Sequence, residues 1–208
     1  MFMVEKNNRF IYCINMDKPH LKWTEESCKK VFDCKVFSVL ETYCTAPYLQ
    51  ESCAEGKIFS IIEAKDWAIV IPVIETQEGK KFLMVWQWRH GSKCLSLEFP
   101  GGVFEPDENP EQAAARELYE ETGFKPGKIT KMGDFSPNPA IMSNKVHFFL
   151  AQDLKCEGSQ KLDEDEYVEI AFVDTEEVIQ GMGKAPYVHA LMGTALSLYY
   201  QQNKKNTE

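Results

Sequence analysis

Three glutamates stand close together in the middle of the chain, at Glu117, Glu120 and Glu121. On a helix, residues four positions apart share a face, so Glu117 and Glu121 would point the same way. Like charges at that spacing destabilise an isolated helix by roughly a few tenths of a kcal/mol. Clustered carboxylates instead suit hard divalent cations, which prefer oxygen ligands. The spacing therefore predicts a site for Mg²⁺ or Mn²⁺, ions that bridge to phosphate oxygens and activate water.

The residues around the glutamates predict the helix that would position them. Asn109 is a favourable N-cap, Pro110 suits the first turn, and Gln112 stands where a capping box needs it. Gly123 suits the position that follows a last helical turn. We therefore expect a helix over residues 110–122. Its narrow apolar side, which we expect to pack on a sheet, is formed by Ala114, Ala115 and Leu118.

The stretch over residues 102–124 resembles the Nudix box, the signature of hydrolases that cleave a nucleoside diphosphate linked to another group. Its fixed positions are filled by Gly102, Glu108, Arg116, Glu117, Leu118, Glu120, Glu121, Gly123 and Phe124. The alternative is a solvated acidic helix face paired with Arg116, and the flanking residues at the right spacings favour the metal site.

The resemblance implies roles for these residues. Glu117 and Glu121 would be metal ligands with Glu120 alongside, and Arg116 would orient the glutamates through ion pairs, with Glu108 as a partner. The turn before the box contains two glycines, which let the backbone approach a ligand closely. We expect the carbonyl of Gly101 to be a further metal ligand.

Two segments before the box and one after it resemble ADP-ribose pyrophosphatases. These segments are Gln87-Trp88-Arg89, Glu98-Phe99-Pro100-Gly101-Gly102, and Pro139, which lies sixteen residues after Gly123. In that family ADP-ribose is hydrolysed to AMP and ribose 5-phosphate. The family pattern has Tyr where this chain has Trp88 and Ala where it has Gly101.

The same resemblance suggests how the substrate is held. Arg89 is the candidate for a phosphate clamp, because a guanidinium suits bidentate phosphate contact. Glu98 would bond the nucleotide or a ribose hydroxyl, and Trp88 would affect stacking on a base or ribose. Pro139 completes the substrate-binding candidates.

An acidic loop over residues 163–166 stands where the family has a glutamate that positions or deprotonates the attacking water. Glu164 is the first candidate for this role and Glu166 the second. The alternative, an acidic loop that is only solvated, stays open.

Other substrates and one other class of protein remain possible at this point. The box specifies the chemistry and not the groups at either end, so a nucleotide sugar, a dinucleoside polyphosphate or a nucleoside triphosphate are alternative substrates. A Nudix module that senses a nucleotide without cleaving it is a further alternative. Such modules usually lack some of the box glutamates, and this chain has all of them.

The charge and hydropathy of the chain limit the classes of binding partner that we expect. The chain has 208 residues and a formal net charge of -9, and it has no basic stripe, which argues against a nucleic acid or an anionic membrane as partner. An anionic pyrophosphate can still bind if metal ions lie between it and the protein. The apolar run over residues 68–74 contains Pro72 and is too short to span a bilayer. No secretory leader is evident near the first residues.

The seven cysteines form no CxxC pair and match no zinc-ligand spacing. Without an export signal, reduced thiols in a cytoplasmic protein are the expectation. The four histidines are scattered, and none pairs with a nearby Cys or Ser as a catalytic motif would.

The pattern of apolar residues predicts an α/β protein. Strands are expected over residues 9–15, 35–43, 57–64, 67–74, 81–89, 128–135, 145–152 and 167–173, and further helices over 24–31, 175–180 and 187–201. The resemblance implies an α/β/α sandwich with a mixed β-sheet and the box as a loop–helix–loop motif. We expect an N-terminal segment, residues 1–56, that carries strands for a homodimer contact, and a Nudix hydrolase domain over residues 57–202.

Overall fold

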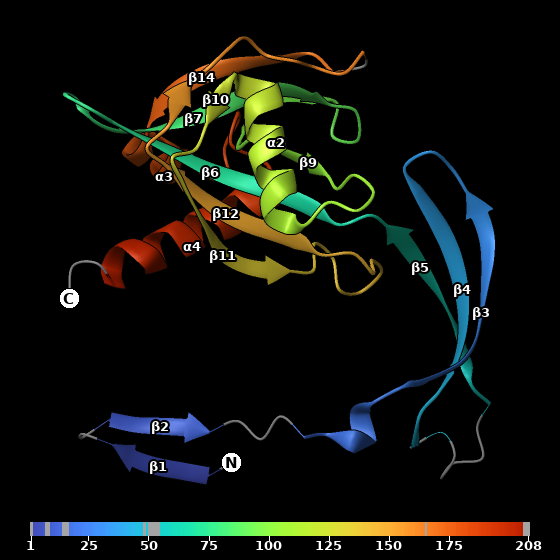
Figure 1. Ribbon diagram of the computed structural model, residues 1–208. Coiled ribbons are helices and arrows are strands. Elements are labelled where there is room, and N and C mark those ends of the chain that lie inside the picture. Colours follow the sequence, from blue (N-terminus) through green and yellow to red (C-terminus); the bar gives the residue numbers. More distant parts are fainter. Residues whose placement is uncertain are drawn as a thin grey trace. The chain divides into compact units, whose positions relative to one another are not determined.

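Strand β6 (Trp67–Thr76) lies at the centre of a seven-stranded mixed sheet in the computed structural model (Figure 1). The order is β11-β12-β6-β7-β14, with β8 paired to β7 and β9 paired to β6. The other strands are β7 (Gly79–Arg89), β8 (Cys94–Glu98), β9 (Gly101–Val103), β11 (Lys128–Phe135), β12 (Val146–Gln152) and β14 (Val168–Asp174). Strands β6 and β12 run parallel, whereas the other pairs are antiparallel. The apolar, β-branched run predicted as a central strand is therefore β6, buried from both faces.

The structure describes residues 2–6, 9–13, 17–47, 49, 55–164 and 166–205. Cys53, Asp165 and the end of the strand expected over residues 9–15 lie outside these residues. The chain divides into two compact units, Met1–Glu63 and Ala64–Glu208. None of the described helices combines the length and the apolar character needed to cross a bilayer.

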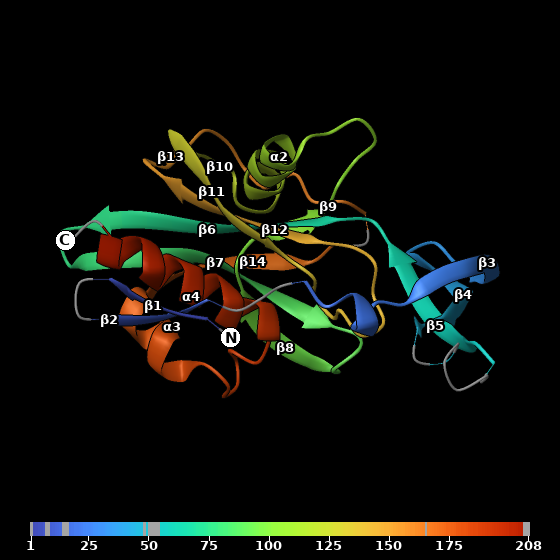
Figure 2. The same cartoon turned by 90° about the horizontal axis from the view of Figure 1, so that it is seen from below.

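Helices cover both faces of the sheet in the second unit. Figures 1 and 2 show α2 (Pro110–Thr122) on one face and α3 (Thr175–Gly181) and α4 (Ala190–Lys205) on the other. Under α2 the core consists of Ala68, Val70, Leu83, Ala113, Ala114, Leu118, Phe149 and Ala151. The expected α/β/α sandwich with a mixed sheet is confirmed.

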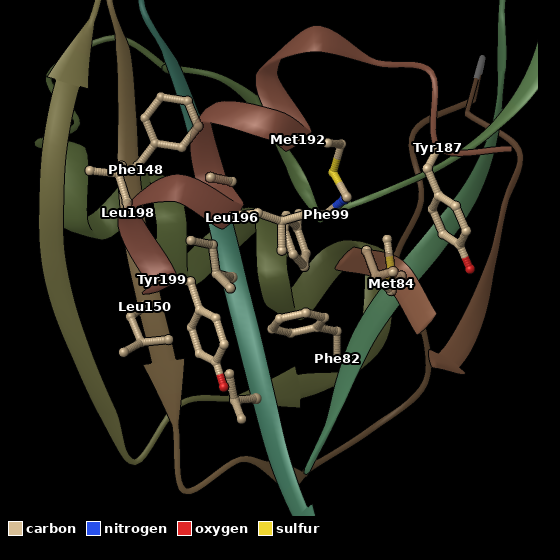
Figure 3. Close-up of a cluster of buried hydrophobic side chains, with 14 of the residues drawn as sticks. Phe82, Met84, Phe99, Phe148, Leu150, Tyr187, Met192, Leu196, Leu198 and Tyr199 are labelled. Atoms are coloured by element: carbon tan, nitrogen blue, oxygen red, sulfur yellow. The ribbon is translucent and has the colours of Figure 1, made fainter. Parts of the chain in front are cut away.

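The face under α4 holds the larger core. Apolar side chains of α4 pack against aromatic and aliphatic residues of β6, β7 and β12, as Figure 3 shows for Phe82, Phe148, Leu196 and Tyr199. The rings of Phe82 and Tyr199 meet edge to face with centroids 5.0 Å apart. The small two-stranded pair β10 (Phe124–Lys125) and β13 (Lys155–Cys156) follows α2 in the same unit.

The N-terminal unit is built from strands. A three-stranded sheet has the order β3-β4-β5, in which β3 and β4 are antiparallel, and β1 pairs with β2 in a separate hairpin. Its elements are β1 (Phe2–Lys6), β2 (Arg9–Cys13), the 3₁₀ turn η1 (Pro19–Leu21), β3 (Thr24–Asp33), β4 (Phe37–Thr45) and β5 (Lys57–Ala64). The two units divide after Glu63, so nearly all of β5 lies in the N-terminal unit, whereas the expected domain boundary places residues 57–64 in the second domain.

The prediction of a helix over residues 24–31 is wrong, because this stretch belongs to strand β3. Its Thr followed by two glutamates resembles a helix start, but β3 pairs along its length with β4, with register shifts after Glu25 and Lys30. Pairing with another strand thus overrides a local preference. On α2 the buried alanines are Ala113 and Ala114, and Ala115 is only partly buried.

Candidate active site

Helix α2 begins and ends where its sequence requires. The side chain of Asn109 accepts hydrogen bonds from the amides of Glu111 and Gln112, and the Gln112 side chain closes the capping box. Gly123 follows the helix in the left-handed conformation, with a φ of 76°. Both ends of the helix are therefore fixed, and its glutamates are held at defined places.

Arg116 is the centre of an ion-pair network. Its Nε and Nη2 donate to the two carboxylate oxygens of Glu108, each at 2.9 Å. Its Nη1 donates to Glu117 and to Glu120, also at 2.9 Å, and Nη2 donates to the Val103 carbonyl at 3.0 Å. A guanidinium has five N–H donors, so all of them are used inside the protein. The contacts bring Arg116, Glu108, Glu117 and Glu120 together as expected from their spacing.

Glu117 and Glu121 are buried against the glycine turn that connects β8 to the box. The Gly101 amide donates to Oε2 of Glu121 at 3.0 Å. A Cβ at position 102 would lie 2.3 Å from Oε1 of Glu117, so this close approach requires glycine. The relative exposure of Glu117 is 7% and that of Glu121 is 2%.

Burial makes these carboxylates reluctant to ionise. It raises the pKa of Glu117 to about 7, Arg116 opposes the shift, and the nearby Glu166 and Glu120 add to it. Burial also raises the pKa of Glu121 well above its ordinary value, with Glu117 and Glu166 contributing. A bound cation would compensate this cost.

The segment that leads into the acidic loop contacts the end of α2. The amide of Lys161 donates to the Glu120 carbonyl at 2.7 Å, and the side chain of Gln160 donates to the Glu121 carbonyl at 2.6 Å. The charge of Glu166, which is partly buried, raises the pKa of both buried glutamates, whereas Glu164 is exposed. Of the two candidates in this loop, Glu166 therefore has the electrostatic link to the carboxylates.

Arg89 and Glu98 form a bidentate pair on β7 and β8. Nε and Nη2 of Arg89 lie 3.0 and 2.7 Å from the two carboxylate oxygens of Glu98. Burial by itself would raise the pKa of Glu98, but Arg89 outweighs it and holds the pKa below its ordinary value. Glu98 is thus paired with Arg89, and the negative charge of Glu121 in turn helps to raise the pKa of Arg89.

His189, which sequence reasoning left aside, lies beside this pair, with Nδ1 3.8 Å from Oε2 of Glu98. Burial lowers the pKa of His189, while Glu98 acts in the opposite direction. No motif could have found it, because 91 residues separate it from Glu98 and only the packing of α4 brings it here.

Trp88 and Pro139, the other two substrate-binding candidates, are both exposed. Successive side chains of a strand point to opposite faces, so Trp88 and Arg89 lie on opposite faces of β7. Trp88 pairs with Leu95 of β8 and is 48% exposed. Pro139 is exposed in the turn between β11 and β12, where Asn138 accepts hydrogen bonds from the amides of Ala140, Ile141 and Met142.

The donor set suits a divalent cation in its chemistry. Among the described residues, Oε2 of Glu117 and Oε1 of Glu121 receive no hydrogen bond, so each carboxylate has an oxygen left for a ligand. Hard cations prefer such oxygens, and they favour the ionised form that burial opposes. As they stand, no three Asp, Glu, His or Cys side chains in the described ranges are grouped closely enough to hold an ion. The fit therefore rests on the chemistry of the glutamates.

Fold and site together define a class: an α/β/α sandwich whose acidic loop–helix–loop motif lies against a mixed sheet. The NUDIX domain model matches residues 65–191, and the chain belongs to the Nudix family. It is a Nudix pyrophosphohydrolase, similar to ADP-ribose pyrophosphatases.

Three known proteins illustrate the similarity. The ADP-ribose pyrophosphatase of Bacillus subtilis (strain 168) is 38% identical over 131 residues, which cover 62% of this chain and 69% of that protein. The methanol dehydrogenase activator of Bacillus methanolicus is 32% identical over 111 residues, covering 53% of this chain and 60% of the activator. A crystal structure of ADP compounds hydrolase superposes with a TM-score of 0.77 at 21% identity, covering 91% of this chain and 98% of that one.

Proposed function

We propose that the protein hydrolyses the pyrophosphate bond of ADP-ribose to give AMP and ribose 5-phosphate in a Mg²⁺-dependent reaction, with Mn²⁺ as an alternative ion. The observation that carries the hydrolytic part is the buried pair Glu117 and Glu121 against Gly101 and Gly102, with every box glutamate intact. The sequence pattern around Arg89 and Glu98 and the similarity to the Bacillus subtilis enzyme support ADP-ribose as the substrate.

We assign the metal to Glu117, Glu120 and Glu121, with the Gly101 carbonyl as a further ligand. When bound, divalent ions neutralise the charge on the pyrophosphate and lower the pKa of a coordinated water. Arg116 holds Glu117 and Glu120 in place and has no N–H left for a substrate. Its role is therefore positional.

The remaining residues handle the substrate and the water. Arg89 binds a phosphate through Nη1, the nitrogen that makes no bond to Glu98, and Glu98 keeps the guanidinium in place. Glu166 is the better candidate than Glu164 to position the attacking water and accept its proton. Trp88, which is exposed beside Leu95 of β8, and Pro139, which is exposed in the turn between β11 and β12, are the further candidates for contact with the substrate.

The chemical step is a displacement at phosphorus. The water oxygen forms a bond to one phosphorus, and the bond from that phosphorus to the bridging oxygen breaks. The bridging oxygen leaves with the electron pair as part of the second phosphate, and the proton lost by the water goes to the base. The protein contributes orientation and charge stabilisation and forms no covalent intermediate.

A product assay tests the proposal. Purified protein is incubated with ADP-ribose, GDP-mannose, a dinucleoside polyphosphate and nucleoside triphosphates, each with Mg²⁺ and with Mn²⁺. We expect AMP and ribose 5-phosphate to form fastest from ADP-ribose, and Glu121→Gln to lower turnover by about 100-fold or more. Glu111→Gln, an exposed residue on the same helix, serves as the matched control. Faster cleavage of another substrate would overturn the assignment of ADP-ribose but keep the chemistry.

A regulatory role is the second candidate, since one similar protein is named for the activation of another enzyme. A protein that binds nucleotide but cleaves nothing in the assay would support that role over hydrolysis.

We further propose that the protein is a homodimer joined through its N-terminal strands. The N-terminal unit exposes many apolar side chains, including Trp23, Phe32 and Ile58. Such surface is typical of an interface.

A further inference from the structure

The connection between α3 and α4 lies along the edge of β8. The Leu97 amide donates to the Pro186 carbonyl at 3.2 Å, and the Ser96 hydroxyl donates to the same carbonyl at 3.4 Å. The Phe99 amide lies 3.1 Å from Sδ of Met192, and these two residues meet in Figure 3. Residues 96–99 are therefore held from outside by a segment that follows them by about ninety positions in the chain.

His189 belongs to this segment and contacts the one charged residue of the stretch. Glu98 is 3% exposed, and both of its carboxylate oxygens accept hydrogen bonds from Arg89. Nδ1 of His189 is 3.8 Å from Oε2 of Glu98. The carboxylate is thus confined between a guanidinium and an imidazole. A rotation of Glu98 would have to displace one of them.

The orientation of Glu98 matters because it sets the orientation of Arg89. The Arg89 side chain is 41% exposed, and its Nη1 makes no hydrogen bond to any described residue. Two parallel bonds to one carboxylate fix the plane of a guanidinium. Whatever fixes Glu98 therefore also fixes the direction in which Nη1 points.

We propose that His189 is a positioning residue that acts through Glu98 to aim Arg89 at a substrate phosphate. The inference rests on the proposed function, in which Arg89 binds that phosphate. His189 would not touch the reacting atoms, and removing it would weaken substrate binding more than it slows the chemical step. In a variant without His189, Arg89 would still be present, but its guanidinium would be wrongly oriented and would lose its contact with the substrate phosphate.

The test compares steady-state kinetics of wild type with His189→Ala, His189→Asn and Val188→Ala. ADP-ribose is the first probe, and the panel substrate cleaved fastest replaces it if the two differ. We expect His189→Ala to raise KM by about tenfold with kcat changed less than about twofold. Asn places an N–H donor near the position of Nδ1, so His189→Asn should recover most of the loss. Val188 is an exposed neighbour in the same connection, and its variant controls for a general disturbance.

A double-mutant cycle separates a role through Arg89 from a merely structural one. In the Arg89→Ala background, His189→Ala should cause no further rise in KM, because the group that it positions is gone. Equal effects of His189→Ala in both backgrounds, or an unchanged KM in the single variant, would overturn the inference and leave the proposed function intact. A wild-type protein that cleaves nothing would overturn both.

Discussion

The carboxylate of Glu117 is held in a position where ionisation is costly. Burial raises its pKa to about 7, above the ordinary value of 4.5, so the folded state binds the proton more tightly than the unfolded state. For a group with a raised folded pKa, stability is highest at low pH and falls as pH rises towards that pKa. Without metal, Glu117 should therefore destabilise the protein increasingly between about pH 5 and pH 8.

We expect Glu117→Gln to remove this penalty. In EDTA, the variant should gain free energy of unfolding relative to wild type as pH rises from about 5 to about 8, by on the order of 2 kcal/mol. Urea denaturation across that range measures the difference. A difference that stays flat with pH would show that Glu117 is not strained by ionisation.

Gly102 gives a second prediction at the scale of one residue. A methyl group at this position would meet Oε1 of Glu117 at 2.3 Å, so Gly102→Ala must move the carboxylate. We expect turnover to fall by about 100-fold, because a displacement of about an ångström has that effect on a reaction that depends on positioning.

Gly91 offers the matched control, since a Cβ there would meet nothing within 4 Å. Gly91→Ala should retain normal turnover, and thermal denaturation of both variants would show whether the fold is preserved. Full activity in Gly102→Ala would mean that Glu117 is free to move without consequence.

At the scale of the element, α2 depends on its N-terminal cap. The Asn109 side chain accepts two backbone hydrogen bonds that would otherwise lack a protein partner. We expect Asn109→Ala to lower the free energy of unfolding by about 1 kcal/mol, measured by urea denaturation, and Asn109→Ser to retain most of it. Equal stability of the two variants would show that the cap is not what fixes this end.

The elements that were predicted correctly from the sequence are those whose structure is specified by residues inside the element itself. The cap, the periodic apolar side and the terminal glycine of α2 are local, and so is the apolar run of β6. Strand β3 had a helix-like start, and only its pairing with β4 decides its structure. Strands β8 and β9 were missed because they are short and occur beside turn residues that dominate the pattern.

The candidate site likewise has one part that could be predicted from residues close in sequence and one part that depends on tertiary packing. The box positions of Arg116 and the glutamates are close in sequence, and their contacts follow from helical spacing. The choice of Glu166 over Glu164, and the presence of His189, depend on how a loop and a distant helix pack. No spacing in the sequence encodes those contacts.

At the scale of the whole molecule, the N-terminal unit exposes apolar surface along its sheet. We expect light scattering after gel filtration to give about twice the chain mass of 23.9 kDa. Phe32 is 56% exposed and Ile58 66%, so a double Phe32→Glu, Ile58→Glu variant should shift the mass towards the monomer. Wild-type protein that stays monomeric at high concentration would refute the dimer.

The glycine at position 102 also bears on how this fold could lose its activity during evolution. The acidic residues attract notice when a relative is judged active or inactive, but here a Cβ at position 102 would also meet the carboxylate of Glu117. If Gly102→Ala lowers turnover as predicted, a descendant with a side chain at this position would keep all its glutamates and still be a slow enzyme. When a family member of unknown activity is compared with this one, the second glycine of the turn is therefore as informative as the glutamates themselves.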